Sequence, residues 1–372
     1  MPNDQKILVL IDSNAIIHRA YHALPKNMST SKGELTNAVY GFTTTLIRVL
    51  EDLHPTHIAA SFDVGKATAR LAQFAEYKAT RVKADQELYD QIPKVKELLE
   101  ALNIPIYTAE GHEADDVLGT IVSKVNGNGS EARFGNVRGL RDRTAKDDTG
   151  VVTDKPFTIY IISGDKDIFQ LVDGNIFVYW LKRGLSEAGV VNRKVIEMEW
   201  GLQPEDFIDL KALAGDSSDN IPGVPGIGPK TATELLKKFD TLEKLYAKIE
   251  AVIPDLIGNP GLDPRIESED DKLVESAAKE LGLKPRVVKL LLEYKEQAFM
   301  SQKLATINRD VPIDFKLEDC EWGDYDKEKL REFFERMQFH SLLKRFGEEG
   351  AQESKTKEAE VQEEKDSQLK LL

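Results

Sequence analysis

Short apolar runs alternate with amphipathic segments through the first half of the chain. Mostly apolar runs at 7–11, 57–62 and 158–163 are too short for helices and are bounded by turn residues. Between them, segments such as 38–53 and 90–102 carry apolar side chains at a spacing near 3.6 residues. This alternation predicts an α/β fold with a mostly parallel sheet flanked by helices.

The second half of the chain has a mainly helical pattern. We expect helices over 204–304, interrupted by a polar linker near 258–271, and one further helix over 327–346 with its apolar residues on one side. Residues 126–156 have little apolar periodicity and predict a long surface loop. The tail after residue 347 is too polar to bury and is expected to be disordered.

Composition limits the class of protein. At 372 residues the chain is long enough for about two domains, and its single cysteine, Cys320, excludes an intramolecular disulfide and argues against a structural zinc site. The apolar run at 7–11 ends on Asp12 and is too short for a secretion signal or a membrane span. We therefore expect a cytoplasmic, nucleoid-associated protein without membrane association.

Aspartates follow all three predicted strands. Asp12 follows the first, Asp63 the second, and Asp165 and Asp167 the third. The carboxyl ends of parallel strands meet at one edge of a sheet, where ligands bind. Two carboxylates about 4 Å apart repel each other by roughly 4 kcal/mol at an effective dielectric constant of about 20, so a shared site needs a cation. Oxygen ligands without His or Cys favour Mg²⁺, or Mn²⁺ as a substitute, and a pair of such ions cleaves phosphodiesters.

Two further acidic motifs extend this set to nine carboxylates. Glu113, Asp115 and Asp116 begin a predicted helix, where acids also serve as simple capping residues favoured by the helix dipole. Asp216 and Asp219 are three residues apart and are expected on one helical face, a spacing that suits a second metal ion. Because capping alone does not require so many acids, we favour the metal site.

The net charge of −14 does not argue against a polyanionic ligand. The nine carboxylates and the tail at 348–372, with eight acidic and four basic residues, account for nearly all of it. Two bound divalent ions would return about four positive charges to the site. The global acidity is therefore compatible with binding of nucleic acid.

A glycine-rich string lies between two amphipathic helical segments. It runs from Gly223 through Gly226 and Gly228 to Lys230 and Thr231. Glycines let a backbone approach another molecule closely, and free amides at a helix start that opens on proline bind phosphate. The alternative is an ordinary Gly/Pro connection between helices. We favour an element that holds the backbone of duplex DNA without reading its sequence.

Basic and aromatic residues are interleaved between residues 70 and 81. If the segment is helical, Arg70, Phe74, Tyr77, Lys78 and Arg81 lie along one face. Such a face supplies phosphate contacts and stacking surfaces for single-stranded nucleic acid. A solvated amphipathic helix has the same pattern, so spacing alone leaves both interpretations open.

Taken in order, these motifs resemble a known family. The strings are Leu10-Ile-Asp, Ser61-Phe-Asp, Glu76-Tyr-Lys-Ala-Thr-Arg, Gly111-His-Glu-Ala-Asp-Asp, Ser163-Gly-Asp-Lys-Asp, Gly215-Asp-Ser-Ser-Asp-Asn and Gly223-Val-Pro-Gly-Ile-Gly-Pro-Lys. They are similar to the 5′ nuclease domain of bacterial DNA polymerase I, a relative of the flap endonucleases. The resemblance covers most of residues 6–346.

The resemblance implies a PIN-like sheet, a helical arch over the active site, and a helix-hairpin-helix element with a K⁺ ion. The first of two metal ions would be held by Asp12, Asp63, Glu113, Asp115 and Asp116, and the second by Asp165, Asp167, Asp216 and Asp219. Among these carboxylates, the catalytic ones would be Asp12, Asp63, Asp116 and Asp165. Lys78 matches an arch lysine that contacts the scissile phosphate, with Arg81 and Arg70 matching basic residues nearby.

The corresponding division of the chain has four parts. They are a catalytic domain at 1–200, with the arch at about 66–90 and an insertion at about 126–156, a helix-hairpin-helix subdomain at 201–310, a closing segment at 311–346 and an acidic tail at 347–372. The insertion and the stretch 258–286 are longer than the usual pattern, and Leu71 stands where a His often follows the arch arginine. Neither departure removes a catalytic group.

The sequence therefore predicts a monomeric, structure-specific 5′-3′ exonuclease and flap endonuclease. It would hydrolyse phosphodiester bonds at 5′ ends or flaps of duplex DNA and at RNA primers paired with DNA, in replication and repair. A binding-only scaffold for branched DNA predicts gaps in the carboxylate set, and a PIN-like ribonuclease does not explain the string at 223–230. The polymerase and proofreading domains are not expected here, although a fragment of a longer polymerase is also compatible with the sequence.

The last five residues resemble the pentapeptide with which bacterial replication proteins bind the sliding clamp. Gln368, Leu369, Leu371 and Leu372 would make this contact from a flexible tether. A five-residue match also arises by chance, so the motif alone does not decide the matter.

Deletion of residues 368–372 is expected to abolish capture of the chain by the sliding clamp. Nuclease turnover should be unchanged, because the deleted residues lie outside the acidic motifs. A clamp pull-down beside a turnover assay measures both effects. Clamp binding that survives the deletion would refute this interpretation of the tail.

Overall fold

A six-stranded sheet forms the centre of the protein. The computed structural model describes residues 6–65, 67–81, 83–127, 157–185, 187–253 and 269–345. The strands are, in spatial order, β3 (Ile106–Tyr107), β2 (His57–Ser61), β1 (Lys6–Asp12), β4 (Phe157–Ser163), β5 (Ile176–Arg183) and β6 (Glu187–Val191). Only the β5–β6 pair of this sheet is antiparallel. The predicted, mostly parallel sheet is confirmed.

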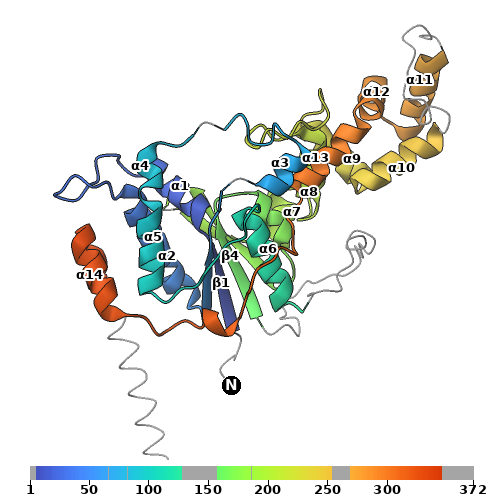
Figure 1. Ribbon diagram of the computed structural model, residues 1–372. Helices are drawn as coiled ribbons and strands as arrows, with labels where there is room; N and C mark the ends of the chain where they lie inside the picture. Colours follow the sequence, from blue (N-terminus) through green and yellow to red (C-terminus); the bar gives the residue numbers. More distant parts are fainter. Residues whose placement is uncertain are drawn as a thin grey trace, which may run out of the picture.

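Alternate residues of the central strands enter two separate cores. In β1, Val9 and Ile11 pack on one face, and Leu8 and Leu10 pack on the other. The first face carries α1 (Ser13–Ala23), α2 (Asn37–Leu53), α4 (Gln86–Tyr89), α5 (Ile92–Ala101) and α14 (Lys327–Met337). The opposite face carries α6 (Ala114–Val125) and the 3₁₀ turn η1 (Asp167–Leu171) (Figure 1). Burial on both faces explains why the strands are continuous apolar runs.

The helices that follow β6 build the second half of the protein. They are α7 (Arg193–Trp200), α8 (Asp206–Ala214), α9 (Pro229–Phe239), α10 (Leu242–Val252), α11 (Glu269–Leu281), α12 (Pro285–Glu293) and α13 (Lys295–Ala305). A last 3₁₀ turn, η3 (Glu318–Cys320), packs beside β2. Figure 1 shows α10, α11 and α12 extending away from the sheet, while α13 packs against α8 and against α3 (Thr68–Gln73). The predicted helical region is confirmed.

Several predicted segments fall outside the part of the chain that the structure describes. The linker near 258–271 and the loop at 126–156 lie mostly outside it, and the tail at 347–372 lies wholly outside it. Within the described ranges, no helix combines the length and the apolar character needed to cross a membrane.

Two segments are less helical than their patterns indicated. The helix predicted over 327–346 is wrong in extent, because Gln338 adopts a left-handed φ of 58° directly after α14 ends at Met337. Helix resumes at 340–345 and stays on the same core, which is why the apolar spacing continues across the break. The segment at 70–81 is helical only as far as Gln73 and then forms turns, so its basic and aromatic residues do not share one helical face.

The strand order determines where the site lies. From β1, the chain passes to β2 and β3 on one side of the sheet and to β4 and β5 on the other. In open sheets of this kind, ligands bind at the carboxyl edge where the order reverses, which here is between β1 and β4. Asp12 ends β1, and Asp165 follows β4 by two residues. The structure therefore confirms that strand-end aspartates share one edge.

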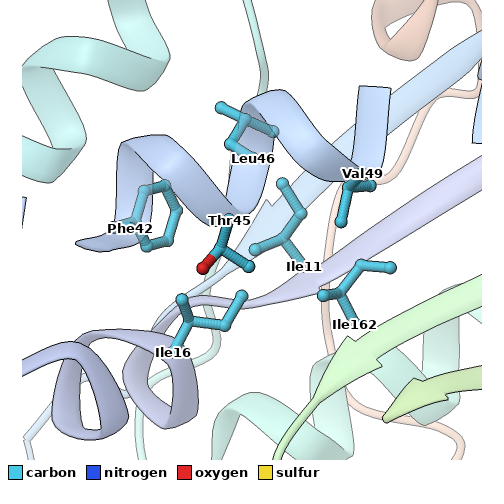
Figure 2. A pocket seen from close by; sticks show the side chains of 7 residues that line it. All are labelled: Ile11, Ile16, Phe42, Thr45, Leu46, Val49 and Ile162. Atoms are coloured by element: carbon cyan, nitrogen blue, oxygen red, sulfur yellow. The ribbon is translucent and has the colours of Figure 1, made fainter. Parts of the chain in front are cut away.

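The core beneath this edge is apolar (Figure 2). Phe42, Leu46 and Val49 of α2 line a cavity of about 10 Å³ together with Ile11 of β1 and Ile162 of β4. A cavity this small holds at most one water molecule, and its apolar lining disfavours even that. Tight packing here fixes the ends of both strands and hence the residues that follow them.

Replacement of Ile162 by Ala is expected to lower the free energy of unfolding by about 2–5 kcal/mol, because the side chain is buried and its loss leaves a cavity. Val190→Ala is the matched control, since Val190 is 43% exposed and should change the free energy by less than about 0.5 kcal/mol. Urea unfolding curves give both values. Equal destabilisation by the two substitutions would contradict this account of the core.

Candidate active site at the carboxyl edge of the sheet

Hydrogen bonds tie the strand-end aspartates to their neighbours. Asp12 caps α1 by accepting a bond from the Ala15 amide at 3.2 Å, and it accepts a second bond from the Ser163 hydroxyl at 2.7 Å. The same hydroxyl accepts from the amide of Asp165 at 3.0 Å. Ser163 therefore links the end of β4 to the end of β1, a role that the sequence analysis did not assign.

The start of α6 brings a third group of acids to the same edge. The Ala114 amide donates to Asp63 at 2.8 Å, so the residues after β2 are held against this helix. Glu113 is the N-cap, and its own amide donates to the Asp116 side chain at 3.2 Å. The prediction that these acids begin a helix is confirmed. Capping explains part of their placement. Basic side chains also pair with these acids, so capping is not the whole explanation.

Arg70 is the buried counter-charge of this group. Its guanidinium donates to Glu113 at 2.5 Å and to both carboxylate oxygens of Asp116 at 2.8 and 2.9 Å, and its Nε donates to the Leu304 carbonyl at 3.1 Å. The residue is 6% exposed. In this structure Arg70 therefore neutralises carboxylates, and the DNA contact predicted for it is not available because α13 covers it.

Tyr77 and Lys78 connect the two acidic motifs. The Tyr77 hydroxyl donates to Glu113 at 2.8 Å and to Asp219 at 3.2 Å. The Lys78 ammonium forms an ion pair with Glu113 and lies 3.7 Å from Asp219. Lys78 has a left-handed φ of 56°, and its amide donates to the Asp219 carbonyl at 2.9 Å. Such a backbone costs roughly 1–3 kcal/mol, which these contacts offset.

Arg81 and Phe74 complete the segment. Arg81 donates to Asp219 at 2.5 Å and to the Ser218 carbonyl at 3.2 Å, yet its side chain is 49% exposed. Phe74 packs against a small apolar cluster that includes Ile208 and Leu304. Arg81 is thus partly accessible to solvent, whereas Phe74 contributes mainly to packing.

Asp167, Asp216 and Asp219 form a candidate metal-binding group. One carboxylate oxygen from each lies within 4.8 Å of the other two. The prediction that Asp216 and Asp219 share a helical face is wrong, because α8 ends at Ala214 and both residues lie in the turn that follows. The turn is closed by paired hydrogen bonds of 2.8 Å between the backbones of Asp216 and Ile221.

Two glycines allow this turn to form. Gly215 and Gly223 have φ values of 74° and 60°, which side chains rarely tolerate. A Cβ on Gly223 would lie 2.1 Å from the Gly215 nitrogen, so the two backbones touch. The Gly223 amide donates to Ser301 and its carbonyl accepts from Gln297, at 3.1 and 2.7 Å. Gly223 therefore shapes the turn, and its amide is not free to bind the phosphate predicted for it.

The rest of the glycine-rich string lies at the surface. Gly226, Gly228 and Lys230 are exposed and Thr231 is partly exposed, while Val224 and Ile227 beside them are buried anchors. Pro229 is the first residue of α9, as predicted, and Gly228 is its N-cap. The start of α9 therefore offers exposed backbone next to a lysine.

Lys211 is a functional candidate that the sequence analysis missed. From α8, its ammonium forms ion pairs with both Asp167 and Asp216, so it lies among the candidate metal ligands. A lone lysine in a helix is usually a solvated residue, so the sequence alone did not predict a role for it. The usable signal was its position five residues before Asp216 in an otherwise apolar and acidic helix.

The remaining acids do not form a second tight group. Among the described residues, the carboxylate oxygens of the five acids expected to hold the first ion do not lie within 4.8 Å of one another. Those of Asp167, Asp216 and Asp219 do. Glu113 and Asp116 are instead engaged by Arg70 and Lys78. Asp165 lies close enough to both Asp12 and Asp167 for its charge to add to the effect of burial in raising the pKa of each. The nine carboxylates thus share one region but are divided by the basic side chains between them.

The pKa values record this crowding. Burial raises the pKa of Asp12 to about 7, and the charges of Asp63 and Asp165 add to the effect. Burial and the charge of Asp165 likewise raise the pKa of Asp167 to about 7. Burial also raises the pKa of Asp115, against the charge of Arg70. These groups are costly to ionise without a cation, and their oxygen-only donors fit a hard divalent ion.

The pKa of Glu113 moves in the opposite direction. Burial alone would raise it, but the charges of Lys78 and Arg70 outweigh burial and hold this pKa below its ordinary value. Glu113 is therefore ionised at neutral pH, whereas Asp12 and Asp167 are only partly so. The site can bind cations more tightly as the pH rises.

Replacing Arg70 with Met in metal-free protein is expected to lower the free energy of unfolding by about 3–5 kcal/mol, since the change leaves buried carboxylates unpaired. Arg336→Met is the matched control, because Arg336 pairs with Glu97 at 2.6 Å but is 51% exposed. It should cost no more than about 1 kcal/mol. Denaturant unfolding in EDTA distinguishes the two, and a small loss for Arg70→Met would show that it is not the counter-charge.

Metal-free protein is expected to lose stability as the pH rises through the acid range toward 7. The folded pKa of Asp12 is about 7 and the ordinary value is 3.8, so between them the folded state binds more protons than the unfolded chain. The free energy of unfolding then falls by up to about 1.4 kcal/mol per pH unit for this group. Asp12→Asn should reduce that slope in EDTA. An unaltered slope would contradict the assignment.

Comparison with protein families identifies both halves of the chain. A profile described as 5′-3′ exonuclease, N-terminal resolvase-like domain matches residues 7–134. A second profile, described as 5′-3′ exonuclease, C-terminal SAM fold, matches residues 202–328. The two matched regions hold all the acids discussed above except Asp165 and Asp167, which lie between them.

Similar proteins include bacterial DNA polymerases. DNA polymerase I of Bacillus subtilis is 37% identical over 349 residues, which are 94% of this chain and 33% of the relative. DNA polymerase I of Streptococcus pneumoniae is 35% identical over 342 residues, which are 91% of this chain and 32% of the relative. This chain spans about a third of the length of these relatives.

Solved structures share the fold at low sequence identity. The T5 5′-exonuclease with bound zinc has a TM-score of 0.55 at 19% identity, covering 82% of this chain and 90% of that one. The catalytic core of Rad2 in complex with DNA substrate has a TM-score of 0.50 at 17% identity, covering 90% and 88%. Because the two domain profiles match in order and together cover more than half of the sequence, the chain belongs to the 5′-3′ exonuclease family.

Proposed function

We propose that this chain is a structure-specific 5′-3′ exonuclease and flap endonuclease that uses two divalent ions, with Mg²⁺ as the natural ion and Mn²⁺ as a substitute. One observation carries the proposal. Nine carboxylates from separate segments converge on the carboxyl edge of the sheet, and three of them lie within 4.8 Å of one another. Family membership supports it, and so do the similar structures described above, one solved with bound zinc and one with DNA substrate.

The geometry supports the following ligand set. Asp167, Asp216 and Asp219 would hold one ion, and Asp12, Asp63 and Asp165 lie at the strand ends where a second would bind. Oxygen-only donors select hard ions of this kind. Such ions, when bound, supply an activated water and stabilise charge at the phosphate. Lys211 pairs with two of these acids, and it would keep them from repelling each other before the ion binds.

The chain's own residues supply binding and orientation. Lys78 and Arg81 lie between the two acidic motifs, and both would turn toward the scissile phosphate when an ion takes over Asp219, the carboxylate that both of them contact. Arg70 would stay in place, because burial and hydrogen bonds to two carboxylates and two backbone carbonyls hold it. The left-handed backbone at Lys78 sets the direction in which its side chain leaves the main chain. It therefore also sets the side from which the lysine would approach the phosphate.

Duplex DNA would be held at the start of α9. Exposed backbone at Gly226 and Gly228, with Lys230 beside it, suits phosphate contacts that do not depend on sequence, and a K⁺ ion bound there would add positive charge. Substrates would include 5′ flaps, 5′ ends and RNA primers paired with DNA. Contact with the sliding clamp through residues 368–372, a monomeric state and a cytoplasmic location complete the proposal.

Incubation of a 5′-labelled flap duplex with the protein and Mg²⁺ tests this function. We expect cleavage near the flap junction, none in EDTA, and cleavage by Asp165→Ala that is slower by about a hundredfold, since loss of even an outer-shell partner of a metal ligand costs about 10- to 100-fold. Asp314→Ala, which changes an exposed acid outside the site, is the matched control and should cleave normally.

Three outcomes would contradict the proposal. Cleavage that persists in EDTA would exclude metal dependence. Cleavage of single-stranded RNA with no cleavage of the DNA flap would favour the ribonuclease alternative. Binding of the flap without any cleavage in Mg²⁺ or Mn²⁺ would favour a binding-only scaffold.

A further inference from the structure

A lysine held by two tryptophans lies next to the acidic site. Lys166 stands between Asp165 and Asp167 in the sequence. Trp180 of β5 pairs in register with Ser163 of β4, so the indole lies at the same edge of the sheet as these acids. Trp200 is the last residue of α7. Neither the motifs nor the proposed function gives these three residues a role.

The two indole rings fix the position of the lysine side chain. The Lys166 ammonium lies 5.9 Å from the ring centre of Trp180 and 5.6 Å from that of Trp200, within cation–π range of both. The indoles contact each other at 5.7 Å, and each contacts Phe169 of η1. Phe169 is fully buried, so the pair is anchored in the core.

No carboxylate of the described residues neutralises the charge of Lys166. Arg70, Lys78, Arg81 and Lys211 are each paired with carboxylates of the site. No carboxylate in the described part of the chain forms an ion pair with Lys166, and the residue is exposed. It therefore presents a positive charge to solvent beside a site that is otherwise acidic.

The surroundings select phosphate over a nucleobase as the ligand. Trp180 and Trp200 are only partly exposed, and they pack on each other and on Phe169, with Lys166 over both rings. Little of either ring is left for a base to stack on. A cation whose side chain is already ordered loses less freedom on binding, so the arrangement suits a fixed anionic group.

We propose that Lys166 binds a backbone phosphate that flanks the scissile phosphate on the cleaved strand, with Trp180 and Trp200 as positioning residues that hold its side chain ready. The inference rests on the proposed function and deepens it. Lys166 is adjacent in sequence to Asp165 and Asp167, so a strand whose scissile phosphate sits at the acidic site would pass an adjacent phosphate near Lys166. The contact also offsets the repulsion between that phosphate and the neighbouring acids.

Two measurements on Lys166→Met test the inference. The first is the affinity of a labelled flap duplex in EDTA over a range of salt concentrations. Loss of one phosphate contact should weaken binding by about five- to tenfold and reduce the slope of log affinity against log salt by about one. The second is steady-state cleavage with Mg²⁺, where KM should rise by a similar factor and kcat should change by less than about twofold.

Matched variants separate binding from folding. Lys6→Met removes a lysine that also lies over an aromatic ring, Phe157 at 5.8 Å, but at the opposite edge of the sheet, so it should behave as the wild type. Lys166→Arg keeps the charge and should restore most of the affinity. Trp200→Leu should weaken binding with the salt slope unchanged, because the charge remains and only its positioning is lost.

The outcomes distinguish this inference from the proposed function. Wild-type cleavage of the flap together with wild-type affinity and salt slope in Lys166→Met would overturn the inference alone. Weaker binding with an unchanged slope and a lowered melting temperature would assign Lys166 a structural role and overturn it as well. If the wild type neither binds nor cleaves the flap, the proposed function fails and the inference fails with it.

Discussion

Mutual repulsion among carboxylates at one sheet edge is the constraint on which this structure depends. The parallel strands deliver Asp12, Asp63, Asp165 and Asp167 to that edge, and α6 and the turn after α8 add five more acids. Four basic side chains offset this repulsion: Arg70, Lys78, Arg81 and Lys211. Where the offset is incomplete, burial and neighbouring charges raise the pKa values of Asp12 and Asp167 to about 7. The site therefore favours the binding of additional positive charge.

The same interaction shapes the segment that covers the site. Between Gln73 and Arg81 the chain leaves the helix, takes a left-handed turn at Lys78, and is tied to the turn at 216–221 by side-chain and backbone hydrogen bonds. Those bonds join a segment of the sheet domain to the helical half. Binding of cations that replace Lys78 and Arg81 as carboxylate partners would loosen this connection. Metal binding and opening of the segment toward DNA are therefore expected to be coupled.

Much of the fold and the acidic site could be predicted from the sequence, because strand and helix periods and strand-end aspartates are local signals. What could not be predicted depends on contacts between distant segments. The apolar and basic spacing at 70–81 fits a helix, but contacts with Glu113 and Asp219 favour turns. Asp216 and Asp219 share a site through a glycine-dependent turn whose closure needs Gly215 and Gly223 to touch. Lys211 and Ser163 carried no local signal, since their roles come from partners elsewhere in the chain.

The central claim is that these converging acids form a binding site for divalent ions. Titration of the protein with Mn²⁺, followed by electron paramagnetic resonance of the free ion, tests it most directly. The account predicts two bound ions per chain in the wild type, with one site lost in Asp167→Asn and affinity that rises with pH as Asp12 and Asp167 ionise. Mn²⁺ that stays free in solution, or binding that is unchanged by Asp167→Asn, would contradict it.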